Sequence, residues 1–432
     1  IRDRNILVRR SQPLPEEAPN PAQEPPHAHT RNIVRFMKER LSADLISNLQ
    51  QIGEVADEIG CGAYVVGGFV RDLFLYRSDE DIDIVIEGDG ITFAKKYAKI
   101  VGARIHSHEK FGTAVIIFPD GFKIDVASAR MEYYKFPAAL PVVEMSSIKL
   151  DLYRRDFTIN TLAIQLNSNK FVTLIDFFSA RKDIKEKIIR VLHNLSFVED
   201  PTRVFRAIRF EQRFEFTIGK LTLGLLANAI SMDFFRELSG KRVFTELRLI
   251  LQEENPVAAI RRLNDFGLLK VIHPSIKFDK DLMAALNSVK KVLSWHDLLF
   301  LEESYKKWIV YFLVLTRNCK SHIAKEICGR FELKPEDEKI LCTERFEADK
   351  CVFWLERNLA VSDSTIYRKL SGFKIEAILF MMAVAKKKAV KKSISHFFTD
   401  LRRTQLSLKG RDLKKMGLKP GPVYRQVMEA VL

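Results

Sequence analysis

The sequence predicts an α+β protein whose strands gather in the N-terminal third and whose remaining length is chiefly helical. Short apolar runs, of the length typical of strands, occupy residues 63–66, 82–86 and 122–126. From Arg181 onward, apolar residues recur mainly at helical spacing. The 432 residues are enough for two to four domains with an ample core.

Residues 1–30 differ in composition from the rest of the chain. They contain six prolines and three glutamates, which predicts an extended linker outside the core. After Thr30, apolar residues at helical spacing continue through Ile59 and predict a helix leading into the sheet.

A strand, a tight turn and a helix are predicted in succession. The apolar run Ala63–Val66 ends at Gly67 and Gly68, and the amphipathic stretch Phe69–Tyr76 comes directly after them. Backbone N–H groups at the start of such a helix favour phosphate, so this turn is a candidate phosphate site.

Three carboxylates occur after this turn. Asp81 and Asp83 flank Ile82 at the start of a predicted strand, and residues two apart in a strand point to the same face. Asp125 lies in a later apolar run that would supply a third carboxylate from a neighbouring strand. Magnesium typically takes one or two carboxylates, with waters and substrate phosphates as its other ligands, so the pattern favours Mg²⁺. An isolated Asp-x-Asp also occurs in surface loops, and the upstream glycine turn is what favours metal here.

Residues 199–213 predict a capped helix with a basic stripe. Asp200 and Pro201 suit the start of a helix. Four arginines recur at three- and four-residue steps and form one stripe that we expect to face a cleft: Arg203, Arg206, Arg209 and Arg213. Four apolar side chains lie largely away from this stripe: Val204, Phe205, Ile208 and Phe210. The alternative is a helix whose basic face is only solvated.

A second arginine-rich motif occupies residues 154–160. Arg154, Arg155 and Asp156 precede the stretch 157–164, which predicts a helix with apolar faces. The alternative for Asp156 is a carboxylate that balances the dipole at the start of that helix, with two surface arginines beside it.

The glycine turn together with the Asp-x-Asp pair resembles the nucleotidyltransferase superfamily of DNA polymerase beta. The motifs at 154–160 and 199–203 resemble two further signatures of its bacterial branch, which contains tRNA CCA-adding enzymes, A-adding enzymes and poly(A) polymerases. The resemblance extends from Gly62 to Pro274 and is fainter beyond, at residues 408–413 and 417–422.

This resemblance implies a fold and a reaction. The fold is a head with a mixed sheet and flanking helices, followed by an all-helical neck, body and tail. In the reaction, an RNA 3′-hydroxyl attacks the α-phosphate of a nucleoside triphosphate and releases pyrophosphate, with two magnesium ions and without a nucleic-acid template. Asp81 and Asp83 would bridge the metal ions, and Asp125 would activate the attacking hydroxyl. The residues assigned to the nucleotide are Gly67, Gly68, Arg71, Arg155, Asp156, Asn160, Asp200, Arg203, Arg206 and Arg209.

The resemblance assigns base recognition to Asp200 and Arg203, and the ribose hydroxyls to Asp156. Cytosine and adenine each offer an exocyclic amino donor beside a ring-nitrogen acceptor, whereas guanine and uracil present the reverse order. A carboxylate beside a guanidinium therefore admits C and A. The pair leaves open whether the chain adds C, A or both.

Positive charge is concentrated near the C-terminus. The chain has 70 basic and 55 acidic residues, a net charge of +15, and residues 377–432 hold 13 basic residues against three acidic ones. We expect this tail to bind RNA phosphates, with affinity falling as salt rises; a solvated basic helix is the alternative. The residues predicted to bind RNA are Lys386, Lys387, Lys388, Lys391, Lys392, Arg402, Arg403, Lys409, Arg411, Lys414 and Lys415.

Four segments are predicted from these patterns. They are a Pro-rich linker, 1–30; a catalytic head, 31–176; a helical neck with base recognition, 177–275; and a helical body with the basic tail, 276–432. The first ten residues faintly resemble the end of a CBS domain, which in some relatives precedes this enzyme, so we expect a fragment of a longer protein.

Membrane, zinc and histidine sites are not favoured by the sequence. No apolar run reaches the length of a membrane helix; residues 377–385 are apolar but short and favour core packing. No signal peptide is visible. Five scattered cysteines without a CxxC unit argue against structural zinc and for a reducing cytoplasm. His296–Asp297 resembles metal phosphohydrolase ligands without companions, and His106 and His108 fit a loop or strand edge better than a metal site.

The preferred prediction is an A-adding tRNA nucleotidyltransferase that acts on tRNA ending in CC. The linker and the CBS-like remnant resemble longer relatives in which CC and A addition are divided between enzymes. A full CCA-adding enzyme that uses CTP and ATP is the first alternative. Residues 137–150 resemble the flexible loop needed for switching to A addition, which argues against a CC-only enzyme. A poly(A) polymerase is the second, and a noncatalytic RNA-binding protein is the alternative from another class. The expected partners are ATP and the 3′ end and acceptor arm of tRNA, with no membrane and no obligate protein partner.

Overall fold

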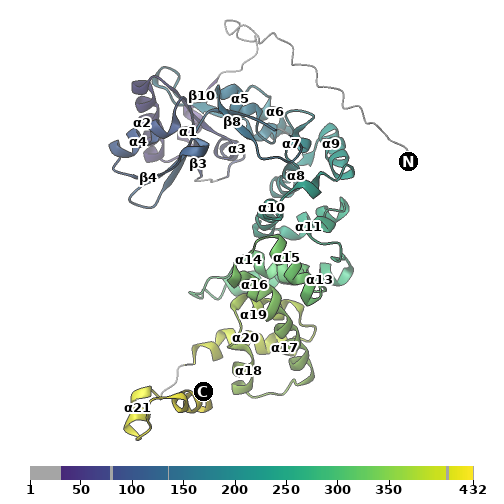
Figure 1. Ribbon diagram of the computed structural model, residues 1–432. Helices are drawn as coiled ribbons and strands as arrows, with labels where there is room; N and C mark the ends of the chain where they lie inside the picture. The colour runs from purple at the N-terminus through teal and green to yellow at the C-terminus, as the bar shows by residue number, and fades with distance from the viewer. Residues whose placement is uncertain (1–30, 78–80, 135, 405–407, 432) are drawn as a thin grey trace, which may run out of the picture. The chain divides into compact units, whose positions relative to one another are not determined.

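The computed structural model describes residues 31–77, 81–134, 136–404 and 408–431 (Figure 1). The predicted linker, 1–30, lies outside the described residues. The chain forms two compact units. The first, here called the head, runs to Tyr133 and resumes at Val143–Glu186, and the second, the helical unit, takes Tyr134–Val142 and Lys187–Leu432. The head therefore continues past residue 176, where the predicted head ends.

Eight strands form one mixed sheet in the head. Their order is β1-β10-β9-β2-β3-β6-β5-β4, in which the pairing of β3 with β6 is parallel and the other neighbours are antiparallel. The strands are β1 Arg31–Asn32, β2 Gly62–Val66, β3 Ile82–Glu87, β4 Arg104–His108, β5 Thr113–Ile117, β6 Lys123–Ser128, β9 Ala163–Gln165 and β10 Thr173–Ile175. Two further strands, β7 Arg130–Tyr133 and β8 Val142–Met145, pair with each other.

Helices cover the two faces of this sheet unequally. The head helices are α1 Val34–Lys38, α2 Ala43–Ile59, α3 Gly68–Phe74, α4 Gly90–Ile100, α5 Ile148–Tyr153 and α6 Ala180–Glu186. The long helices α2 and α4 pack together on one face (Figure 1). On the other face, Ile148 and Leu152 of α5 pack on Tyr64 and Val85 in a second buried cluster. This second face also carries the acidic residues described below, so it is only partly covered.

Residues 157–164 do not form the predicted helix. Thr158–Asn160 is one turn of 3₁₀ helix, and strand β9 comes next, between β2 and β10. Ile164 pairs with Val65 on one side and Leu174 on the other, and it is fully buried. A strand that is buried on both faces reads as a continuous apolar run, which periodicity alone does not separate from a short helix.

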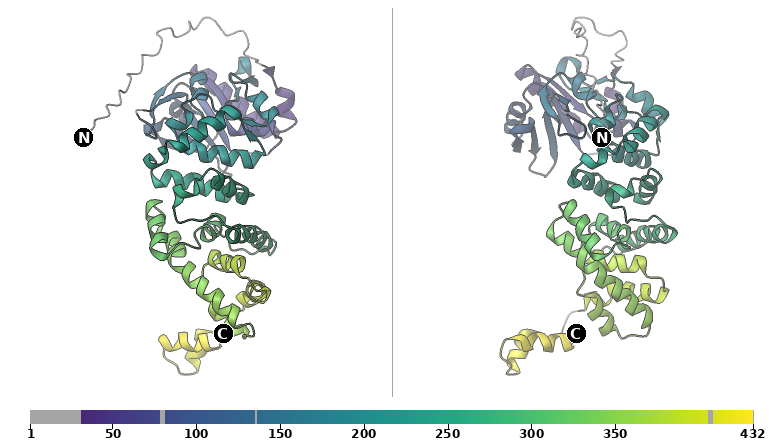
Figure 2. Two further views of the ribbon diagram at one scale, coloured as in Figure 1. Left: turned by 90° about the vertical axis from the view of Figure 1, so that its right-hand side faces the viewer. Right: turned by 45° about the vertical axis from the view of Figure 1, so that its right-hand side comes forward.

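The helical unit contains stacked helices (Figure 2). They are α7 Ser196–Glu199, α8 Thr202–Phe214, α9 Lys220–Ser231, α10 Gly240–Gln252, α11 Pro256–Asp265, α12 Leu269–Ile272, α13 Lys280–Asp297, α14 Lys307–Leu315, α15 Ser321–Arg330, α16 Pro335–Lys339, α17 Arg345–Arg357, α18 Asp363–Leu370, α19 Ile375–Val384, α20 Lys388–Thr399, α21 Gly410–Lys415 and α22 Pro422–Val431. A π-helical segment, Ile340–Glu344, joins α16 to α17.

The fold class is α+β, as predicted, with one correction in the neck. The neck is not wholly helical, because β11 Ile188–Ile189 pairs in parallel with β12 Thr217–Ile218. Helix α19 is buried along its length, so the apolar run 377–385 packs in the core as predicted. Within the described part of the chain, no helix is long and apolar enough to cross a membrane.

Candidate active site

An acidic row crosses the head sheet where β3 meets β6. Along β3 the side chains of Ile82, Ile84 and Ile86 are buried, whereas Asp83 between them is exposed. The parallel pairing sets Asp83 directly opposite Asp125 of β6. Cross-strand partners share a face of the sheet, and residues two apart on one strand do too, so Asp81, Asp83 and Asp125 face the same side. The predicted strands and the predicted neighbour relation are therefore confirmed.

The charges of this row act on one another. The pKa of Asp125 is raised, first because the carboxyl is partly buried and second because the negative charge of Asp81 is near; Lys123 opposes the shift. Concentrated carboxylate oxygens are the donors that a hard divalent cation prefers. Among the described residues no group of three or more acidic, histidine or cysteine side chains is arranged to hold a metal by itself. The row fits a metal that completes its shell with water and substrate oxygens.

Gly67 brings a guanidinium to the acidic row. It ends β2 with φ 74° and ψ −127°, a backbone conformation that residues with a Cβ rarely adopt. A Cβ at this position would lie 2.5 Å from Nη1 of Arg155 and 3.8 Å from Oδ2 of Asp83. The missing side chain thus makes room for Arg155 beside the carboxylate. The N–H of Gly67 already donates to the carbonyl of Leu162 at 3.1 Å, so that amide is engaged within the protein.

Arg155 is anchored by a carboxylate on one side. Its Nη2 lies 3.3 Å from Oδ2 of Asp151, a residue that is fully buried. Its Nε–H is buried and has no hydrogen-bond partner among the described residues. Buried polar groups are normally paired, so this donor favours an anionic ligand at the same place.

Three other residues predicted to bind nucleotide form one buried network. Arg71 donates to both carboxylate oxygens of Asp72 at 2.8 Å and to Oδ1 of Asn160 at 2.5 Å. Asn160 in turn donates to Oδ1 of Asp156 at 2.8 Å, and the backbone N–H of Phe157 donates to the same oxygen. The network holds Asp156 and Asn160 in place and engages the guanidinium of Arg71 with protein groups.

Sequence reasoning did not single out the two acidic partners of these arginines. Asp72 directly follows Arg71, and Asp151 precedes Arg154 and Arg155 by three and four residues. That spacing places opposite charges on one side of a helix, so it was a usable signal for Asp151.

In the helical unit, Asp200 and Arg203 lie near the start of α8, where the backbone N–H of Arg203 donates to the carbonyl of Asp200 at 3.1 Å. Asp200 lies between α7 and α8, and its Oδ1 accepts from the N–H of Thr202 at 2.9 Å. Helix α8 thus begins one residue later than predicted, after Pro201. Arg203 is buried and donates from Nη1 to Oγ of Ser196 at 2.7 Å.

Arg242 of α10 is a partner that the sequence did not reveal. Its Nη2 donates to Oδ1 of Asp200 at 2.9 Å, and its Nη1 donates to the carbonyl of Ala138 at 2.7 Å. The amide of Ala138 also donates to the carbonyl of Val198 at 3.3 Å. Ala138 therefore packs with the helices that flank Asp200, although β7 and most of β8 belong to the head.

The arginine stripe on α8 is accompanied by acidic side chains of neighbouring residues. Arg206 lies 3.7 Å from Glu246, and Arg209 and Arg213 each lie 3.8 Å from Glu253. Burial lowers the pKa of Arg209, and its Nε–H has no hydrogen-bond partner in the part of the chain that the structure describes. The apolar face of the helix is confirmed, because the side chains at 204, 205, 208 and 210 are all buried.

Some residues of the basic tail contact other protein groups, and most of the tail's basic residues are exposed, Lys387 being both. Lys387 donates to the carbonyl of Glu356 at 2.7 Å, Lys391 lies 3.5 Å from Oγ of Ser288, and Arg402 contacts Glu303. The exposed residues of the predicted RNA-binding set are Lys386, Lys387, Lys388, Lys392, Arg403, Lys409, Arg411, Lys414 and Lys415.

His296 and the pair His106 and His108 lie in different surroundings. His296 is 3% exposed and packs against Tyr305 and Phe398. His106 and His108 lie on β4, the edge strand of the sheet, as expected from the sequence, with their rings 4.9 Å apart.

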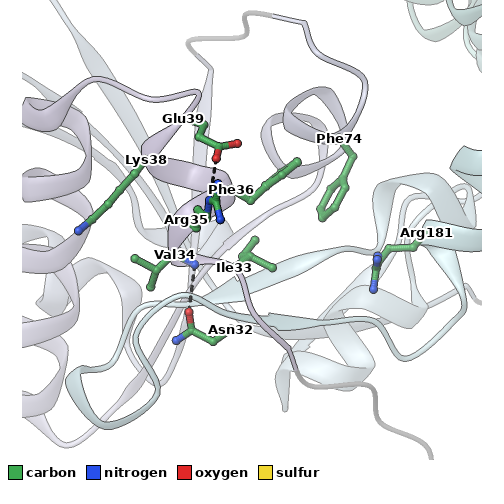
Figure 3. A pocket seen from close by; sticks show the side chains of 9 residues that line it. All are labelled: Asn32, Ile33, Val34, Arg35, Phe36, Lys38, Glu39, Phe74 and Arg181. Atoms are coloured by element: carbon green, nitrogen blue, oxygen red, sulfur yellow. Dashed lines mark hydrogen bonds and ion pairs between the residues drawn. The ribbon is translucent and has the colours of Figure 1, made fainter.

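A hollow of about 940 Å³ lies beside α1 in the head (Figure 3). The rings of Phe36 and Phe74 stack there at 4.8 Å, and the guanidinium of Arg181 lies 5.8 Å from the centre of the Phe74 ring. None of the described residues that line it belongs to the predicted catalytic or nucleotide-binding set. It is therefore a separate feature of the surface.

Two family models match parts of this chain, and solved structures of CCA-adding enzymes resemble it. The model for the poly A polymerase head domain matches residues 63–190, and the one for a probable RNA and SrmB-binding site of polymerase A matches residues 216–279. The structure of the Thermotoga maritima CCA-adding enzyme complexed with tRNA is 33% identical, with a TM-score of 0.74 and 93% of each chain covered. The chain belongs to the bacterial tRNA nucleotidyltransferase and poly(A) polymerase family.

Two curated relatives within this nucleotidyltransferase family are named as A-adding enzymes. The A-adding tRNA nucleotidyltransferase of Geobacter sulfurreducens is 47% identical over 406 residues, which are 93% of this chain and 46% of that protein. The A-adding tRNA nucleotidyltransferase of Aquifex aeolicus is 33% identical over 368 residues, 85% of this chain and 44% of that protein. The chain thus spans about half the length of these two relatives. Nucleotidyltransferases of this family generally use a divalent metal.

Proposed function

We propose that the chain is an A-adding tRNA nucleotidyltransferase, which transfers AMP from ATP to a tRNA that ends in CC. The observation that carries nucleotidyl transfer is the register of Asp83 against Asp125, with Asp81 on the same face and Arg155 beside Gly67. The choice of A addition rests on the 47% identity to an A-adding enzyme over 93% of the chain.

In the head, Asp81 and Asp83 are the proposed ligands for Mg²⁺. Bound magnesium would lower the pKa of the attacking hydroxyl and neutralise the charge of the leaving pyrophosphate. Asp125 would orient the RNA 3′-hydroxyl and accept its proton, a role that suits a carboxyl whose pKa is raised. The new bond joins the RNA 3′-oxygen to the α-phosphorus of ATP. The bond that breaks joins that phosphorus to the oxygen of pyrophosphate, which leaves.

The triphosphate and the ribose have separate proposed partners in the head. Arg155 and the turn at Gly67 and Gly68 would hold phosphate oxygens, which is supported by the buried Nε–H of Arg155, a donor without a partner among the described residues. Asp156 would accept from the ribose hydroxyls. Arg71 would assist by fixing Asn160, which in turn fixes Asp156.

In the helical unit, Asp200 and Arg203 are the proposed base-selecting pair. Asp200 would accept from the exocyclic amino group of adenine, and Arg203 would donate to the ring nitrogen. Guanine and uracil would present a donor to Arg203 and an acceptor to Asp200, which leaves both groups mismatched. Arg206 and Arg209 would add positive charge.

The basic tail would bind the body of the tRNA, with its exposed lysines and arginines on phosphates. We place the reaction in the cytoplasm, where tRNA is processed, with Mg²⁺ as the metal and ATP as the nucleotide.

A full CCA-adding enzyme is the second candidate. The Asp200–Arg203 pair admits both C and A, and the Thermotoga maritima CCA-adding enzyme matches 93% of the chain. Poly(A) polymerase is less well supported, because its support is the names of the two family models, whereas the similar curated proteins cited above are named as tRNA nucleotidyltransferases.

One assay separates these candidates. Purified protein with magnesium receives tRNA transcripts that end before CCA, after C and after CC, with labelled ATP or CTP supplied separately and together. A single AMP added only to the CC-ended tRNA supports the proposal. Incorporation from CTP on the shorter ends would replace it with CCA addition, and repeated AMP addition would replace it with poly(A) synthesis.

A further inference from the structure

The head sheet has an exposed basic surface on the side of β4 and β6. Along β4 the side chains of Arg104, His106 and His108 alternate with half-buried neighbours and are exposed. On β6 the exposed residues are Lys123 and Asp125, and those between them are buried. Helix α4 packs on these strands, where it covers the buried side chains. The exposed side chains therefore form the opposite face, here called the β4 face: Arg104, His106, His108 and Lys123.

The strand register joins the β4 face to the acidic row. His106 of β4 pairs with Val115 of β5, Val115 pairs with Asp125 of β6, and Asp125 pairs with Asp83 of β3. These four residues form one line across the sheet and share one face. Neighbouring strands lie about 4.8 Å apart, so His106 is about 10 Å from Asp125 along this line.

The other side of the acidic row is already occupied. Beyond Asp83 lie β2 and Gly67, with Arg155 against the glycine. That is the side to which the proposed function assigns the triphosphate. The attacking hydroxyl must reach the α-phosphate from the opposite direction, so the RNA end approaches Asp125 over β5 and β4.

We propose that the β4 face binds the last nucleotides of the RNA substrate and leads its 3′-hydroxyl to Asp125. This inference rests on the proposed function and specifies where the RNA end lies. Arg104 and Lys123 both belong to the next row of the register, through Ile117, and supply positive charge for phosphates along one side of the line. The rings of His106 and His108, 4.9 Å apart and perpendicular, offer flat surfaces for bases. Val115 and Ile117 of β5 are half-buried and form an apolar floor between β4 and β6.

The chemistry of the face favours a single-stranded RNA end. Positive charge combined with ring surfaces that stack on any base is the usual means of binding unpaired nucleotides. A double helix would present phosphates and hydroxyls but would keep its bases inside, away from the two imidazole rings. The unpaired end of a tRNA that awaits its terminal A has the matching form.

The test uses the full chain with CC-ended tRNA and with a short RNA hairpin of the acceptor arm alone. The variants are His106→Ala with His108→Ala, and Arg104→Gln with Lys123→Gln. The matched control is Lys99→Gln, an exposed cation on α4 on the other side of the sheet. We expect each pair to raise the KM for the hairpin about tenfold, as loss of one stacked base or phosphate contact does. The KM for ATP should stay unchanged in both pairs, and Lys99→Gln should leave the KM for the hairpin unchanged.

Two further measurements distinguish loss of RNA binding at the β4 face from a general disturbance of the fold. The Arg104→Gln, Lys123→Gln pair should lower the slope of log KM against log salt by about one unit, and the histidine pair should leave that slope unchanged. In the wild-type complex, a photoreactive 3′-terminal nucleotide on the RNA should crosslink to β4. This experiment does not depend on the folding of any variant. An unchanged KM in both pairs, or crosslinks confined to other elements, would overturn the proposal.

The crosslink also distinguishes failure of the proposed reaction from failure of the proposed binding surface. If no RNA receives a nucleotide while the 3′ end crosslinks to β4, the proposed reaction fails and the binding surface stands. If AMP is transferred while the crosslink and the KM values point elsewhere, the reaction stands and the surface is wrong.

Discussion

Arg242 of α10 holds the carboxylate of Asp200 at 2.9 Å while its second nitrogen binds the carbonyl of Ala138 at 2.7 Å. One guanidinium thus ties a proposed base-selecting residue to a segment that lies much earlier in the chain. Asp200 also accepts from the N–H of Thr202, so its orientation is fixed from two sides.

Replacing Arg242 with alanine is expected to weaken base selection. Asp200 would lose its charged partner and rotate more freely, which should lower kcat/KM for ATP about tenfold, or about 1.4 kcal/mol, and reduce the preference over GTP. Steady-state kinetics with each nucleotide measures both. Lys241→Ala is the control, because the neighbouring Lys241 is mostly exposed and lies 3.7 Å from Glu332. Equal selectivity in Arg242→Ala and wild type would contradict the positioning role.

Gly67→Ala is expected to disturb both the backbone and Arg155. The added Cβ would lie 2.5 Å from Nη1, so the guanidinium must move away from Asp83. A displacement of about 1 Å near reacting groups typically lowers the rate about 100-fold. Gly60→Ala is matched for positive φ, at 76°, yet its Cβ would meet nothing within 4 Å. We therefore expect Gly60→Ala to lower the melting temperature with little change in kcat, and a similar kcat for both variants would argue against a role for Arg155.

Asp83→Asn is expected to lower nucleotide incorporation about 10³-fold while tRNA binding is retained. The amide would remove one negative charge from the row shared with Asp81 and Asp125. Incorporation of labelled AMP measures the rate, and filter binding measures tRNA affinity. Glu109→Gln removes an exposed charge elsewhere in the head and should leave both values unchanged. Near-normal incorporation by Asp83→Asn would remove the assignment of metal ligands.

Charges in the C-terminal tail are expected to contribute unequally to tRNA binding. Arg411, Lys414 and Lys415 are exposed, so their joint replacement by glutamine should lower the slope of log affinity against log salt by about two units. Arg402 is engaged by Glu303, and Arg402→Gln should lower stability and leave the slope unchanged. Titrations over a range of salt concentrations give the slopes. Equal slopes for the triple variant and wild type would exclude these residues from phosphate contact.

His296 is expected to make the helical unit less stable in mild acid. Burial lowers its pKa below the ordinary value of 6.5, since the ring is surrounded by aromatic side chains. As the pH falls, His296 therefore takes up a proton in the unfolded chain before it does so in the folded chain. The stability that is present above about pH 6.5 is lost as the pH falls toward the pKa of the folded state. From pH 7 to pH 5, the melting temperature should fall more for the wild type than for His296→Phe. The exposed His322→Gln is the control, and an equal loss in all three proteins would contradict the prediction.

Local sequence was sufficient for the elements that carry the acidic row. Ala63–Val66, the two glycines and Ile82–Ile86 predicted a strand, a turn and a second strand, and the two-residue spacing at the start of that second strand predicted that Asp81 and Asp83 share one face. Similarly, the spacing of the arginines and apolar residues predicted helix α8 and its buried face. These features depend on side chains that are near one another along the chain.

The same local reasoning failed at β9. Residues 157–164 are apolar because the strand lies in the interior of the sheet between β2 and β10, and no nearby residue signals which neighbours it will have. Likewise, nothing near Asp200 indicates that Arg242 and Ala138 will meet it.

The chain's own motifs thus determined its family, its acidic row and the basic stripe of α8, since strand and helix periods set which side chains share a face. Tertiary structure decided the partners: Asp125 opposite Asp83, Arg155 against Gly67, Arg242 on Asp200. Each of these contacts joins segments far apart in sequence, and such pairs form only when the order of strands and the packing of helices bring them together.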